Sequence, residues 1–329
     1  MIAGPGDRVT EFGLQAHSDF SGSRVSTPFR KPPRLRAGST IGVAAVSGPV
    51  DPAKLDLGLE ALRSRGYRVV EATNLRARDG FLAGTDGERA DGYRELVCDP
   101  AVDAIFFARG GYGASRILSR LDPAEIRANP KIHLGGSDLT ALFAYIAAHA
   151  PLVTFYGPMV AVQLADGDPP DWEQVLSGAP AESHTFQPDD VIRPGRADGP
   201  ITGGCLSLLA SLSGTPEAVG GAGRILFWED VGEEIYRLDR MLTQLERSGT
   251  FETLSAMLIG SVAPGRREGM ESPEEIRAWL RRRFADAPFP VAMGFPAGHL
   301  ESTRTIALGA RARVDLDSGL VDFPEIPVA

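Results

Sequence analysis

The chain has 329 residues, of which 43% are hydrophobic and 23% are charged. This composition is typical of a globular protein long enough for two modest domains, and it excludes fibrous and disordered classes. The 43 acidic residues outnumber the 34 basic ones, giving a net charge of -9 that argues against nucleic acid or anionic lipid as a partner. Two cysteines, Cys98 and Cys205, are too few for a disulfide framework or a four-cysteine zinc site.

The first 33 residues follow neither the helical nor the strand period and end in Lys31-Pro32-Pro33, so we interpret residues 1–33 as a loose extension. No apolar stretch in the chain reaches the length of a signal h-region at the N-terminus or of a membrane span elsewhere. We therefore expect a cytoplasmic protein that does not bind membranes.

From residue 34 to 165, short apolar runs alternate with amphipathic segments. The expected strands are 41–46, 67–70, 104–108 and 132–134, and the expected helices are 52–65, 87–97, 114–121 and 139–150. This β-α-β alternation predicts an α/β domain with a parallel sheet covered by helices.

The pattern dissolves between about residues 166 and 200, where Asp, Gly, Pro and Ser predominate, and we place the connection between two domains there. Residues 201–329 then predict a mixed α/β domain. Its expected helices are 206–212, 236–247 and 273–284, and its expected strands are 224–228, 256–259, 290–293 and 312–316.

Ser137 stands between the apolar strand 132–134 and an apolar helix, after Gly135 and Gly136. A serine at such a corner is lifted out of the sheet, beside a helix N-terminus with free N–H groups, as in a nucleophile elbow. The alternative is that Ser137 only caps the helix.

A nucleophilic serine needs a general base, and the five histidines differ in their reach. His133 on the preceding strand and His149 at the far end of the following helix are too distant from Ser137 by the rise per residue of strands and helices. His17 and His184 fall in segments that would hold a base poorly. His299, in a Pro/Gly loop after an apolar strand, remains as the candidate base.

A carboxylate should orient the imidazole, and Glu229 and Asp230 follow the apolar run 224–228. Because successive strand residues point to opposite faces, only one of the two can face the site, and spacing does not decide which.

A second glycine cluster, Arg109-Gly110-Gly111-Tyr112-Gly113, lies between a strand and a helix. It lacks the spacing of a dinucleotide-binding motif and the Lys of a P-loop, which argues against a nucleotide site. The cluster favours an oxyanion hole, and the alternative is a plain tight turn. In that interpretation the N–H of Gly111 and that of Asp138 would converge on a developing oxyanion. No metal-ligand spacing occurs, and we expect no metal or cofactor.

Six segments occur in order along the chain: ARGGYGASRIL (108–118), GGSDLTAL (135–142), YGPM (156–159), GGCLSLLASLSGTP (203–216), LFWEDVGEEIYRLDRMLTQL (226–245) and Gly298-His299. Together, over about residues 33–320, they resemble the LD-carboxypeptidases of the S66 serine-peptidase class.

The resemblance implies a Ser-Glu-His triad of Ser137, Glu229 and His299, in a cleft between an N-terminal and a C-terminal domain. It implies hydrolysis of the bond between an L-centre and a terminal D-alanine in murein tetrapeptides, in cell-wall recycling, with a small peptide or muropeptide as the partner and with dimers in many relatives. Arg109, Tyr112, Cys205 and Trp228 are then candidate substrate contacts.

The chain departs from the family pattern at two positions. Gly136 stands where Tyr usually precedes the nucleophile, and Cys205 stands where Asn is usual, although Cys205 also suits a core. One alternative is the microcin-immunity type of S66 hydrolase, which cleaves aminoacyl or peptidyl nucleotide analogues. Another is a ligand-binding protein of the same fold without turnover.

Overall fold

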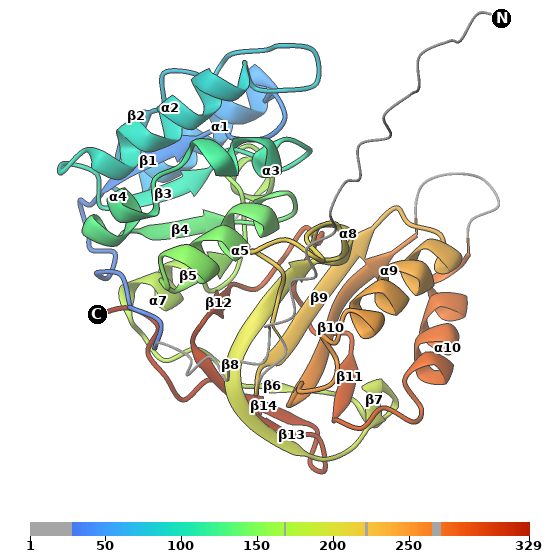
Figure 1. The fold of residues 1–329 in the computed structure, drawn as a ribbon. Coiled ribbons are helices and arrows are strands. Elements are labelled where there is room, and N and C mark those ends of the chain that lie inside the picture. The colour runs from blue at the N-terminus through green and yellow to red at the C-terminus, as the bar shows by residue number, and fades with distance from the viewer. Residues whose placement is uncertain (1–27, 168, 221–222, 265–270) are drawn as a thin grey trace, which may run out of the picture.

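The computed structural model describes residues 28–167, 169–220, 223–264 and 271–329. Most of the predicted extension, together with His17, lies outside these ranges. Two sheets organise the molecule, one in each half of the chain, and helices pack on both (Figure 1). The expected two-part α/β architecture is confirmed.

The N-terminal sheet has the strand order β12-β5-β4-β3-β1-β2. Its strands are β1 (Thr40–Ala44), β2 (Arg68–Glu71), β3 (Ala104–Phe107), β4 (Ile132–Gly135), β5 (Thr154–Tyr156) and β12 (Ile306–Leu308). β1 to β5 are parallel, as predicted, and β12 pairs antiparallel with β5. Because β12 comes from the C-terminal half, the last segment of the chain ties the two halves together.

Helices surround this sheet. They are α1 (Pro52–Ser64), α2 (Asp86–Cys98), α3 (Ala114–Ile117), α4 (Pro123–Ala128), α5 (Leu139–His149), α6 (Gln163–Asp166) and α7 (Trp172–Ser177), with a 3-10 turn at η1 (Leu118–Arg120). Local signals set several starts: Asp51 accepts from two amides of α1, and Thr85 with Glu88 forms a capping box on α2.

The C-terminal sheet has the order β6-β14-β13-β8-β9-β10-β11-β7. Its strands are β6 (His184–Thr185), β7 (Val191–Arg193), β8 (Arg196–Cys205), β9 (Ile225–Val231), β10 (Ala256–Ala263), β11 (Val291–Met293), β13 (Arg311–Asp315) and β14 (Leu320–Asp322), and a 3-10 turn, η2, covers Pro188–Asp190. β8 to β11 are parallel, and the outer strands are antiparallel, which makes the sheet mixed as expected.

Helices α8 (Leu206–Ser211), α9 (Ile235–Arg247) and α10 (Pro273–Arg283) belong to this half, and α9 and α10 lie beside β9 and β10 (Figure 1). Leu238 and Leu242 of α9 and Leu280 of α10 form one core cluster with Trp228 and Met257 of the sheet. The larger core cluster contains the N-terminal sheet and extends to β8, β9 and β13.

The structure differs from the sequence prediction in two segments. Residues 166–200 are not a plain connection, since they contain α7, β6, β7 and the start of β8. The last residues of the predicted extension are held in place, because Arg30 forms a bridge with Leu152 and the N–H of Ala329 donates to Pro32 O over 2.8 Å.

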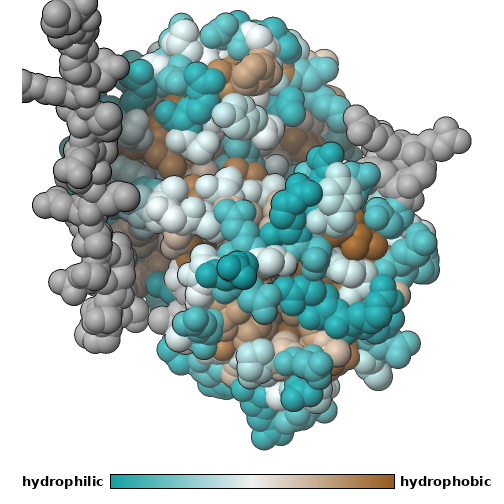
Figure 2. All heavy atoms as spheres, turned by 45° about the vertical axis from the view of Figure 1, so that its right-hand side comes forward, coloured by the Kyte–Doolittle hydropathy of each residue, from teal (hydrophilic) through white to brown (hydrophobic). Residues whose placement is uncertain are grey.

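On the face shown in Figure 2, hydrophilic side chains alternate with small groups of apolar ones. Within the described ranges, none of the helices has the length and apolar character to cross a membrane.

Candidate active site

Ser137 lies at the corner between β4 and α5 with φ at 61°, one of two non-glycine residues with positive φ in the described chain. Such backbone strain in a serine is typical of a nucleophile elbow. The N-cap of α5 is Asp138, and no side-chain oxygen caps this helix. The alternative of Ser137 as a simple helix cap is therefore wrong.

The structure brings together the three predicted triad residues. Ser137 Oγ lies 3.1 Å from His299 Nε2, and His299 Nδ1 lies 2.7 Å from Glu229 Oε2. Because a carboxylate only accepts, Nδ1 donates to Glu229 and leaves Nε2 free to accept the serine proton. The three groups thus have the order and polarity needed for nucleophile activation.

Glu229 comes from β9 and His299 from the loop after β11. The backbone N–H of His299 also donates to Glu229 Oε2, over 3.1 Å, so the loop is fixed to the acid at two points. Gly298 permits this approach: it has φ at 122°, and a β-carbon there would lie 2.7 Å from Glu229 Oε2. The Gly-His pair is therefore a steric requirement as well as a sequence motif.

The charges around His299 favour its protonated form. Burial disfavours the imidazolium of His299, but the hydrogen bond to Glu229 and the negative charges of Glu229 and Asp230 outweigh it and raise the pKa of His299 above its ordinary value. Glu229 itself is completely buried.

The glycine turn after β3 packs directly on the nucleophile. A β-carbon at Gly110 would lie 2.7 Å from Ser137 Cβ and 3.3 Å from the Asp138 nitrogen, so only glycine allows this contact. Gly111 follows with φ at 113° and is exposed. The turn and the elbow thus meet side by side, which is the arrangement that the predicted oxyanion donors at Gly111 and Asp138 require.

The Asp138 carboxylate links three turns at the carboxyl ends of neighbouring strands. Its Oδ2 accepts from Ser47 Oγ (2.6 Å), after β1, and from the Ala114 N–H (2.8 Å), after β3. Burial raises the pKa of Asp138, and its Oδ1 is buried without a hydrogen-bond partner in the described chain. Crevices at this edge of a parallel sheet are the usual binding sites of α/β folds.

Two predicted substrate contacts flank the same turn. Arg109 is half-buried, and its Nη1 donates to Pro49 O over 3.0 Å, while no carboxylate of the described residues forms an ion pair with it. Its Nη2 lies 3.6 Å from the position of a β-carbon at Gly111. Tyr112 is 51% exposed, and its ring centroid lies 5.8 Å from that of Phe81.

The other two predicted contacts lie inside the protein. The prediction that Trp228 contacts substrate is wrong, because Trp228 is completely buried on the core side of β9, where its indole N–H faces Met257 Sδ at 3.2 Å. Cys205 is buried too; its Sγ lies 3.2 Å from Ser207 Oγ and 3.7 Å from Asp230 Oδ2. Asp230 therefore faces α8 rather than His299.

His133 and His149 have other partners. His133 is fully buried against the Tyr93 hydroxyl (2.9 Å), and burial lowers its pKa to about 4. His149 Nε2 lies 2.8 Å from Glu217 Oε1. Both imidazoles therefore contact groups other than Ser137. Among the residues with described positions, no three His, Cys, Asp or Glu side chains gather as metal ligands.

One contact of the site was not predicted. The Tyr156 hydroxyl accepts from the Ser137 N–H over 2.8 Å and donates to Glu229 Oε1 over 2.6 Å. Tyr156 belongs to the quoted Tyr-Gly-Pro-Met segment, but a single tyrosine at the end of a three-residue strand gives no signal of its own.

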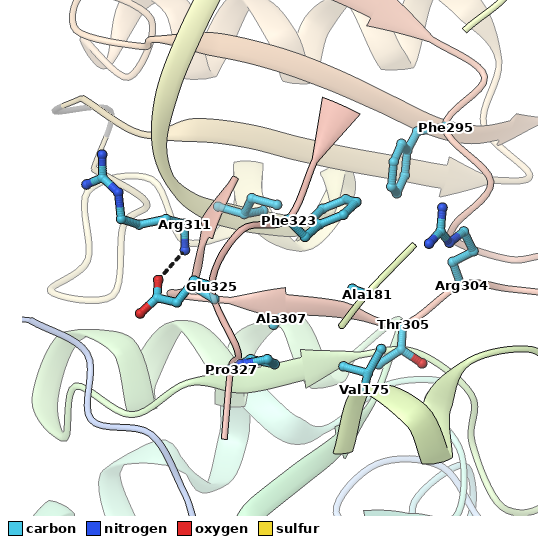
Figure 3. A pocket seen from close by; sticks show the side chains of 12 residues that line it. Val175, Ala181, Phe295, Arg304, Thr305, Ala307, Arg311, Phe323, Glu325 and Pro327 are labelled. Atoms are coloured by element: carbon cyan, nitrogen blue, oxygen red, sulfur yellow. Dashed lines mark hydrogen bonds between the residues drawn. The ribbon is translucent and has the colours of Figure 1, made fainter. Parts of the chain in front are cut away.

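An open groove of about 840 Å³ begins near the turn and runs between helices of both halves. Tyr112, Ser207, His149 and Glu217 are among its lining residues, and none of the triad residues lines it. A second cavity, of about 20 Å³ and mainly apolar, lies among Phe295, Phe323 and Ala307 (Figure 3). None of the triad residues lines the second cavity.

Comparisons with known proteins identify the family. Residues 41–157 match the model of the LD-carboxypeptidase N-terminal domain, and residues 198–314 match that of the C-terminal domain. A putative carboxypeptidase of Streptomyces coelicolor is 40% identical over 88% of this chain and 94% of its own length. A probable murein peptide carboxypeptidase of Bacillus subtilis is 35% identical over 87% of this chain and 91% of its own length.

Among solved structures, the microcin C7 self-immunity protein MccF, known from Escherichia coli, superposes with a TM-score of 0.80 at 25% identity, covering 91% of this chain and all of its own. The matched regions contain all three triad positions, Ser137 in the first and Glu229 and His299 in the second. The chain therefore belongs to the LD-carboxypeptidase family of S66 peptidases.

Proposed function

We propose that this protein is a serine carboxypeptidase that removes a terminal D-amino acid from an L-centre, as in the conversion of murein tetrapeptide to tripeptide. The observation that carries the proposal is the continuous hydrogen-bonded relay from Ser137 Oγ through His299 to Glu229. A binding protein of the same fold without turnover would need neither this direction of the hydrogen bonds nor the strained backbone at Ser137.

In the proposed reaction, Ser137 Oγ attacks the carbonyl of the scissile amide while His299 Nε2 takes its proton. The N–H groups of Gly111 and Asp138 stabilise the oxyanion. Collapse breaks the C–N bond, and the imidazolium returns the proton to the leaving amine. His299 then deprotonates a water molecule that hydrolyses the acyl-enzyme.

The substrate assignment rests on Arg109 as well as on the family. A carboxypeptidase must bind the free carboxylate beside the scissile bond, and Arg109 offers a half-buried guanidinium next to the oxyanion turn with no ion-pair partner among the described residues. The name of the Bacillus subtilis relative supports a murein peptide as the substrate class.

The similarity to MccF supports a second candidate, hydrolysis of an aminoacyl or peptidyl nucleotide analogue. The same triad would cleave either amide. The two candidates differ in what lies beyond the scissile bond, a small free carboxylate in one and a nucleoside in the other.

The test is mass spectrometry of products after incubation with L-Ala-γ-D-Glu-meso-diaminopimelate-D-Ala or with an aminoacyl-sulfamoyl adenosine. Ser137→Ala removes the nucleophile, and Ser211→Ala, an exposed serine of α8, is the matched control. We expect the wild type and the control to release one alanine, and Ser137→Ala to lose the activity roughly 10⁶-fold.

Cleavage of the adenosine conjugate alone would establish the second candidate in place of the first. Release of alanine by Ser137→Ala at the wild-type rate would contradict the assigned nucleophile.

A further inference from the structure

Tyr156 connects the two halves of the site through a single hydroxyl group. It lies at the end of β5 with 2% of its surface exposed. The Ser137 N–H can only donate, and the phenol has only one proton, so that proton is directed to Glu229 Oε1. The polarity of both hydrogen bonds is thereby fixed.

The aromatic ring of Tyr156 is closely packed. Phe227 of β9 lies edge-on at 5.6 Å between ring centroids. On another side, a β-carbon at Gly136 would lie 3.4 Å from Tyr156 Cζ. Because the ring is confined in this way, its hydroxyl is a fixed point between the elbow and β9.

The first consequence concerns the nucleophile. The positive φ of Ser137 is an unfavourable conformation for a residue with a β-carbon, and it persists only when neighbouring groups hold it. The hydrogen bond to Tyr156 satisfies the Ser137 amide in that conformation. It also occupies this amide, so the oxyanion donors must come from neighbouring residues such as Gly111 and Asp138.

The second consequence concerns the acid. Glu229 Oε2 accepts from the side chain and the backbone of His299, and Oε1 accepts from Tyr156. Burial, followed by the nearby charge of Glu229, raises the pKa of Tyr156 well above its ordinary value. The phenol therefore keeps its proton and remains a donor across the working pH range.

We propose that Tyr156 is a positioning residue of the triad, whose hydroxyl holds the strained backbone of Ser137 and the carboxylate of Glu229 in mutual register. This inference rests on the proposed function, since it concerns the alignment of the same three groups. It adds a role that neither the triad nor the oxyanion turn contains.

The test is Tyr156→Phe, which removes the hydroxyl and keeps the ring. We expect kcat to fall roughly tenfold to a hundredfold with little change in KM, because alignment is lost and not substrate binding. Tyr93→Phe is the matched control, since Tyr93 is also buried in the N-terminal half and its hydroxyl also has a buried hydrogen-bond partner, His133, which does not belong to the triad.

The pH profile supplies a readout that a purely structural defect would not move. The charged groups acting on His299 are Glu229 and Asp230, and Cys205 is the further titratable group close to both. Without the hydrogen bond from Tyr156, the negative charge of Glu229 is less well stabilised by its other neighbours. It then stabilises the imidazolium of His299 more strongly, which raises the pKa of His299. The acidic limb of kcat/KM should therefore move to higher pH in Tyr156→Phe and stay in place in Tyr93→Phe.

Two outcomes would overturn the inference: a wild-type rate and profile in Tyr156→Phe, or equal losses in both variants that follow their loss of thermal stability. If the wild type cleaves neither substrate, the rate of covalent labelling of Ser137 by a fluorophosphonate replaces turnover. Slower labelling in Tyr156→Phe alone would then support the inference although the proposed function had failed, and equal labelling rates would reject it.

Discussion

The two sheets contribute to the site in different ways. The N-terminal sheet contributes mainly backbone: the left-handed turn at Ser137, the close approach of Gly110 and the exposed turn residue Gly111. The C-terminal sheet contributes side chains, the buried carboxylate of Glu229 and the imidazole of His299. The N-terminal half is therefore sensitive chiefly to added atoms, and the C-terminal half is sensitive to changes of charge as well as to an added atom at Gly298.

This difference follows from where each half meets the site. Parallel strands deliver their loops to one edge, and glycine-rich turns there allow backbones to approach within van der Waals distance. Strand β9 instead points alternate side chains to opposite faces, so it can present Glu229 to the site while Trp228 fills the core. Substitutions that add atoms and substitutions that remove a charge should therefore distinguish the contribution of the N-terminal half from that of the C-terminal half.

The largest effect should come from a change of charge in the C-terminal half. Glu229→Gln replaces an acceptor of His299 Nδ1 by an amide that also donates, so the imidazole loses its orientation and the stabilisation of its charged form. We expect kcat/KM to fall roughly 10⁴-fold. Steady-state kinetics of alanine release by the wild type and by Glu229→Gln measures this fall in kcat/KM.

Glu234→Gln is the control for Glu229→Gln, since Glu234 is a surface acid that pairs with Arg237 after the same strand. It should keep the wild-type rate. If Glu229→Gln retained more than about a tenth of the activity, the carboxylate would not be the orienting acid.

A steric change in the N-terminal half should have the next largest effect. Gly110→Ala places a β-carbon 2.7 Å from Ser137 Cβ and 3.0 Å from its Oγ, so the nucleophile must move. A displacement of about 1 Å costs roughly a hundredfold in rate. We expect that loss in kcat without a shift of the pH profile, because the charges around His299 are unchanged.

Gly87→Ala is the control for the added methyl group, because Gly87 lies in α2 and a β-carbon there would make only an ordinary contact, 3.9 Å from Thr85 Oγ1. Thermal melts of both variants would show whether the fold is kept. A rate for Gly110→Ala within twofold of the wild type would mean that the turn yields and does not position Ser137.

The same contrast explains what could be predicted from the sequence. Ser137 and His299 followed from a strand-to-helix corner and from the reach of the histidines, and the choice of Glu229 over Asp230 came from family resemblance. The prediction that Trp228 contacts substrate was wrong, although the sequence could have excluded it. The alternation of strand residues that separates Glu229 from Asp230 also places Trp228 on the face opposite Glu229.

Other features had no local signal. Strand β12 has only three residues, and its pairing with β5 depends on a contact between segments about 150 residues apart in the chain. The strands within residues 166–200 lie mostly at sheet edges, where polar and Gly/Pro-rich sequence is tolerated. Tyr156 acts through two hydrogen bonds that only the folded state brings together.

The smallest effect on activity should come from Asp230, which neighbours Glu229 in sequence but serves another purpose. Its carboxylate accepts from the N–H groups of Ser207 and Val231, both at 2.8 Å, and does not contact His299. Asp230→Asn should therefore change kcat/KM less than about tenfold. It should lower the free energy of unfolding by about 1–3 kcal/mol near pH 4, because the amide can replace only one of the two acceptor oxygens.

The pH dependence of stability sharpens this prediction. Burial raises the pKa of Asp230 to about 6 from an ordinary value of 3.8. Between those values the folded protein binds more protons at this group than the unfolded chain, so its contribution to stability is present at low pH and is lost as the pH rises through 6. Asp230→Asn lacks this titration, so the stability difference between wild type and variant should be largest near pH 4 and shrink toward pH 7, by about 3 kcal/mol at most. Urea unfolding across this pH range measures it, with Asp239→Asn on the surface of α9 as control. A difference independent of pH would contradict the prediction, because it would show that burial does not raise the pKa of Asp230.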